Sequence, residues 1–123
     1  MCIFLKIEEK TEVLPNFEGI GLKDDHCQKR QKGGRQEGLS YLSSFLDERG
    51  QHYSRKMSSP VTAYENCSRI SPYLAFGSLS VREVFKKIEE RKELISEDSQ
   101  IEAKSWSRSL RAFSSRLRWH CHF

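Results

Sequence analysis

The chain reads CSRISPYLAFGSLS over residues 67–80, and this stretch predicts how its central part folds. Ser71 and Pro72 indicate a helix start, because a serine hydroxyl can accept a hydrogen bond from the first turn and proline is favoured at the first helical position. A helix start offers unpaired N–H groups and a partial positive charge, which suit an anion. Ser68 and Arg69 add a hydroxyl and a cation. The stretch therefore indicates phosphate binding, and a capped helix without a ligand is the alternative.

The apolar spacing on either side predicts an all-α chain. Apolar residues recur every three or four positions over residues 34–49, which predicts a helix that ends at Gly50. Residues 51–70 are expected to form a long loop or short turns. A short helix is expected over residues 71–77, closed by Gly77.

Two longer helices are predicted after residue 80. Ser80 and Glu83 have the spacing of a capping box, so a helix is expected from Ser80 to about Leu94. The next is expected to begin near Ser99 and to run to the end of the chain. Its core-facing stripe is predicted to be Trp106, Leu110, Phe113 and Leu117.

Arg116 is the unusual cation of the last predicted helix. It lies in a row with Ala112, Trp119 and Phe123, which are apolar. A buried arginine needs a partner, and phosphate is a natural bidentate one. The alternative is an arginine whose stem lies on Trp119 while its charge stays in water.

Residues 1–33 are predicted to be a linker. Alternation of apolar residues allows one short strand over residues 3–7, and glycine, proline and charged residues follow. The basic run over residues 29–32 indicates either phosphate contact or a solvated loop.

Composition and cysteine spacing limit the classes of function. A net charge of +4 permits contact with nucleic acid without demanding it. The four cysteines show no C-x-x-C spacing, so reduced thiols in a cytoplasmic or other intracellular chain are expected. Histidine and cysteine are adjacent at residues 26–27 and 120–122, and adjacent helical side chains point in different directions, so no metal site is assigned. The apolar run near the N-terminus is too short for a signal peptide or a membrane span.

Residues 67–84, which read CSRISPYLAFGSLSVREV, closely resemble the flavin-binding signature of the DNA photolyase and cryptochrome family. Weaker similarity extends upstream to the glycine pair at residues 33–34 and downstream through residues 106–123. The resemblance implies that residues 34–123 are the first portion of that family's helical FAD-binding domain, incomplete and preceded by the linker. We expect the chain to be a fragment of such a protein.

The resemblance also implies six FAD-binding positions, four of which belong to the signature: Tyr53, Cys67, Ser68, Ile70, Ser71 and Arg116. Hydroxyls and backbone N–H groups at Ser68, Ile70 and Ser71 would bind the diphosphate. Cys67 replaces the more usual threonine and is a much weaker hydrogen-bond donor. Tyr53 and Arg116 would lie beside the cofactor.

What the resemblance implies for function is blue-light-driven electron transfer from flavin to a pyrimidine lesion flipped out of DNA, the reaction of a carbon–carbon lyase. Family members that repair dimers usually carry a glutamate and a tryptophan where this chain has Ala112 and Ser115. This departure favours one alternative, a blue-light photoreceptor without repair activity. The other alternative is a small basic helical module that binds nucleic acid without flavin.

Arg108, Arg111 and Arg118 could form a docking surface for DNA or could be ordinary solvated charges. We assign no catalytic residue. The chain alone is not expected to enclose the flavin or to perform the photochemistry, and its oligomeric state stays open.

Overall fold

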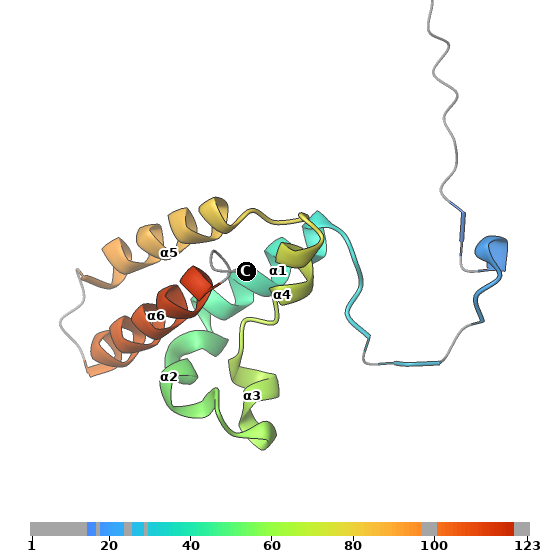
Figure 1. Ribbon diagram of the computed structural model, residues 1–123. Coiled ribbons are helices and arrows are strands. Elements are labelled where there is room, and N and C mark those ends of the chain that lie inside the picture. Colours follow the sequence, from blue (N-terminus) through green and yellow to red (C-terminus); the bar gives the residue numbers. More distant parts are fainter. Residues whose placement is uncertain (1–14, 17, 24–25, 29, 97–100, 120–123) are drawn as a thin grey trace, which may run out of the picture. The chain divides into compact units, whose positions relative to one another are not determined.

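The computed structural model describes residues 15–16, 18–23, 26–28, 30–96 and 101–119, and the chain divides into two compact units, residues 1–31 and 32–123. The described part of the first unit contains one turn of 3-10 helix, η1 (Glu18–Ile20), whose residues are exposed (Figure 1). The Gly19 N–H donates to Asn16 Oδ1 at 2.8 Å and closes this turn. The strand predicted over residues 3–7, and Lys29 of the basic run, lie outside the described residues.

The second unit is helical, and its described part contains no strand, which confirms the all-α prediction for these residues. Its elements follow one another in the order α1 (Arg35–Asp47), η2 (Arg49–His52), α2 (Tyr53–Lys56), α3 (Pro60–Asn66), α4 (Ser71–Ala75), α5 (Val81–Ser96) and α6 (Ile101–Trp119). The three long helices correspond to the three long helices predicted. Figure 1 shows α5 and α6 running antiparallel, side by side, with α1 next to them.

The segment after α1 differs from the prediction. The prediction for residues 51–70 is a long loop or short turns, but most of these residues form the end of η2, α2 and α3. Pro60 is at the start of α3, after an extended Ser59, as the sterics of a residue before proline require. Gly50 does not end α1; it lies in η2, where a Cβ would come within 2.5 Å of the Phe45 carbonyl oxygen. The glycine is therefore needed for close packing rather than for stopping the helix.

The core lies where α1, α5 and α6 meet the short helices η2 and α2. Its centre is aromatic: the rings of Phe45 and Phe113 have centroids 4.6 Å apart, and Tyr53 packs edge-on against Phe45 at 5.5 Å. All four residues predicted for the core stripe of α6 are buried, which confirms that stripe: Trp106, Leu110, Phe113 and Leu117.

The start of α5 confirms half of the predicted capping box. The Glu83 N–H donates to Ser80 Oγ at 3.1 Å. The Glu83 carboxylate, however, is bound by the Arg35 guanidinium, with Nη1 to Oε2 at 3.0 Å. This hydrogen bond from Arg35 is the main cause that holds the pKa of Glu83 below its ordinary value, and it ties α5 to the first turn of α1.

Candidate functional site

The turn between α3 and α4, residues 67–70, is the predicted phosphate-binding segment. Its backbone is irregular: Cys67 is extended, and Arg69 has φ of +58°, a left-handed conformation that arginine rarely adopts. Ser68 and Ile70 are 9% and 1% exposed, so Ile70 is fully buried and only a small part of Ser68 is open to solvent. The Arg69 guanidinium carbon lies 4.0 Å from the centroid of the Tyr64 ring.

Arg49 of η2 holds this turn against α1. Its Nη1 donates to the Cys67 carbonyl at 2.6 Å, its Nε to Ser44 Oγ at 2.6 Å, and its Nη2 to the Tyr41 carbonyl at 3.0 Å. Burial lowers the pKa of Arg49, and the nearby charge of Arg69 lowers it further. Two guanidinium groups therefore flank the turn, one fixed by three acceptors and the other stacked on an aromatic ring.

Three of the predicted FAD-binding residues lie close together. Burial raises the pKa of the Tyr53 hydroxyl, the nearby Cys67 thiol raises it further, and the Arg116 guanidinium acts in the opposite direction. Burial also raises the pKa of Cys67, against the effect of the adjacent Arg49 and Arg69. The structure thus brings α2, the turn and α6 together around the Tyr53 hydroxyl, while the ring of Tyr53 belongs to the core.

The predicted capping role of Ser71 is wrong. Ile70 holds the capping position without a side-chain hydrogen bond, and Ser71 is the exposed first residue of α4. The backbone of Ser71 is already helical, so its hydroxyl does not fold back onto the first turn. Because α4 has only five residues, its start is a weak basis for anion binding, and any phosphate contact here depends on the side chains of the turn.

Arg116 is exposed, and its guanidinium carbon lies 4.4 Å from the centroid of the Trp119 ring. Arg116 is therefore not a buried cation, and its guanidinium rather than its stem lies over the tryptophan ring. An exposed guanidinium stays accessible to a ligand.

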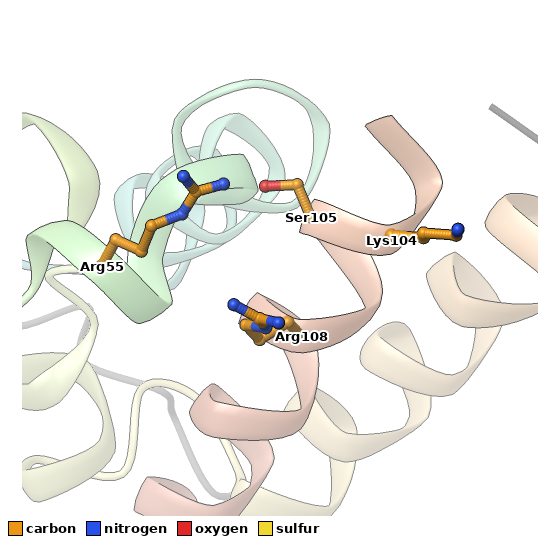
Figure 2. Close-up of a pocket in the computed structure, with 4 residues that line it drawn as sticks. All are labelled: Arg55, Lys104, Ser105 and Arg108. Carbon is orange, nitrogen blue, oxygen red and sulfur yellow. The ribbon is translucent and has the colours of Figure 1, made fainter. Parts of the chain in front are cut away.

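A pocket of about 160 Å³ opens between α2 and α6, lined by Arg55, Lys104, Ser105 and Arg108 (Figure 2). Figure 2 shows the Arg55 guanidinium reaching from α2 towards Ser105, with Arg108 further along α6 and the Lys104 ammonium pointing away from Arg55. The Ser105 hydroxyl donates to the Gln51 carbonyl at 3.0 Å, and the Ser109 hydroxyl donates to the same oxygen at 2.8 Å.

Sequence reasoning considered only Arg108 among these lining residues. Arg55 and Lys104 are far apart in the chain, and each is an ordinary exposed cation, so no sequence signal could have paired them. Within the described residues, no group of three histidine, cysteine or acidic side chains could hold a metal ion, and residues 120–122 lie outside that part.

Comparison with protein-family models, with curated proteins and with solved structures found no match to this chain. In the described part of the chain, no helix has both the length and the apolar composition needed to cross a bilayer.

Proposed function

We propose that the chain contributes the diphosphate-binding side of an FAD site in a flavoprotein of the photolyase and cryptochrome kind, which acts on pyrimidine lesions in DNA. The observation that carries the proposal is the resemblance of residues 67–84 to the flavin-binding signature of that family. A reducing, intracellular compartment suits it, since the described Cys67 is a thiol outside any disulfide.

The donor set of the turn suits a diphosphate. Ser68 and Ser71 supply hydroxyls, and Arg69 and Arg116 supply guanidinium groups, which bind phosphate oxygens in a bidentate manner. Arg49 fixes the carbonyl of Cys67, so the turn is held in place before a ligand arrives. Such preorganisation lowers the entropy lost on binding.

Each residue has a separate task in this proposal. FAD, when bound, supplies absorption of blue light and electron transfer. The hydroxyls of Ser68 and Ser71 donate to the phosphate oxygens, and Arg116 offsets their negative charge. Tyr53 presents its hydroxyl to the ligand while its ring stays in the core.

The test is a ¹H–¹⁵N NMR titration of the whole chain with FAD, ADP and riboflavin. FAD and ADP should shift the amide signals of residues 68–71, and riboflavin, which has no phosphate, should not. Arg116→Gln should weaken the response, and Arg82→Gln, an exposed arginine of α5, should not. Amide signals at 68–71 that stay in place at millimolar FAD would contradict the proposal.

A photoreceptor without repair activity is the second candidate, favoured by Ala112 and Ser115 at the positions of the lesion-binding glutamate and tryptophan. Ala112 is half-buried and Ser115 is exposed, and neither can bind a lesion as those side chains do. Illuminating the complete flavoprotein that is expected to contain this chain, together with DNA that contains a thymine dimer, separates the candidates. Loss of the dimer indicates repair, and an unchanged dimer together with flavin photoreduction indicates a photoreceptor.

A further inference from the structure

We propose that the pocket between α2 and α6 binds a backbone phosphate of a nucleic-acid strand through Arg55 and Arg108. These residues are not among those assigned to FAD. The inference rests on the DNA partner of the function proposed above and adds the residues that would hold the DNA backbone. It is tested independently of flavin binding.

The charges around the pocket are unbalanced. Within the described residues, Arg55, Lys104 and Arg108 have no ion pair and no hydrogen bond, whereas Arg35 and Arg49 are fully engaged. No carboxylate lines the pocket. A hollow lined by three cations and no carboxylate concentrates positive potential and attracts an anion.

The shape and the donors of the pocket suit a phosphate. A volume of about 160 Å³ is many times what a single water molecule needs and leaves room for a phosphate group. The planar guanidinium groups of Arg55 and Arg108 match phosphate oxygens in pairs. The Ser105 hydroxyl donates its hydrogen bond to the Gln51 carbonyl. Ser105 therefore holds the wall of the pocket in place rather than binding the phosphate.

The surface beyond the pocket favours a strand over a single anion. On α6, Lys104, Arg108, Arg111 and Arg118 follow the spacing i, i+4, i+7 and i+14, which places them on one face of the helix. All four are exposed. This row covers about 20 Å along the helix axis, far more than one phosphate group needs. We call these four residues the basic stripe; the pocket lies at its N-terminal end.

The test is fluorescence anisotropy of the whole chain with a short labelled oligothymidine over a range of salt concentrations. The variant Arg55→Gln/Arg108→Gln should raise the Kd about tenfold and reduce the slope of log K against log salt by about 1. The matched control is Arg82→Gln/Lys86→Gln, which removes two exposed cations from α5. It should change neither quantity beyond about twofold. Circular dichroism verifies that both variants fold.

Three outcomes would overturn the inference. The first is no binding of oligothymidine by the unchanged chain at low salt. The second is equal weakening in the pocket variant and the control, which indicates diffuse attraction only. The third is inorganic phosphate binding the pocket as tightly as oligothymidine does, which indicates a site for a small anion.

Discussion

Replacing Arg49 by methionine is expected to lower the free energy of unfolding by about 3 kcal/mol. The guanidinium of Arg49 donates to Ser44 Oγ, to the Cys67 carbonyl and to the Tyr41 carbonyl. A hydrogen bond from a charged donor contributes roughly 1.5–3 kcal/mol, but Arg49 is only half-buried and water can replace part of each bond. We therefore count about 1 kcal/mol for each of the three. Methionine keeps the apolar stem and removes every donor.

The assay is urea unfolding of the whole chain, followed by far-ultraviolet circular dichroism. With a slope of about 1 kcal/mol per molar urea, the midpoint should fall by about 3 M. Arg82→Met is the matched control, because Arg82 is exposed and has no partner within the described part of the chain. Its midpoint should not move. A shift of less than about 0.5 M for Arg49→Met would refute the role given to this arginine.

Three further changes have expected outcomes. Gly38→Ala should lower the Tm in calorimetry by the equivalent of about 1–3 kcal/mol, because the new Cβ would lie 2.9 Å from Tyr73 Cγ. Glu83→Gln should lower the Tm at neutral pH but not in acid strong enough to protonate the carboxylate. Arg35 depresses the pKa of Glu83, so the stabilisation from this pair is lost as pH falls through the folded-state pKa. The urea midpoint of the unchanged chain should decline above about pH 10, because burial raises the pKa of Tyr53 in the folded state and stability is lost as pH rises. Tyr53→Phe removes the titrating hydroxyl and should abolish this decline.

The long helices could be predicted because their apolar residues repeat with the helical period over many turns. In α6 the stripe from Trp106 to Leu117 is buried as expected. Short helices do not show such a period. For α2 and α3, packing decides the structure: both contact η2, and α2 also packs on α6, which lies far away in the sequence.

The candidate site was predictable in its residues more than in its geometry. Cys67 and Arg116 both act on the pKa of Tyr53, and the assignment of these residues to FAD stays a prediction. The capping prediction for Ser71 is wrong because Ile70 holds the capping position and the backbone of Ser71 is already helical. The sequence did not predict the role of Arg49, because no local pattern distinguishes a partly buried arginine from an exposed one. Such residues become visible only when tertiary contacts are known.

Two hydroxyls that share one oxygen determine how α6 is oriented. Ser105 and Ser109 lie one turn apart, and both bond to the carbonyl of Gln51. Each residue of an α-helix turns the direction of its side chain by about 100°, so sliding α6 by a single position would break both bonds together. The two bonds therefore fix both the rotation of α6 about its axis and its position along that axis. The direction in which a cation on the outer face of α6 points is set by these bonds, without a contact from the cation itself.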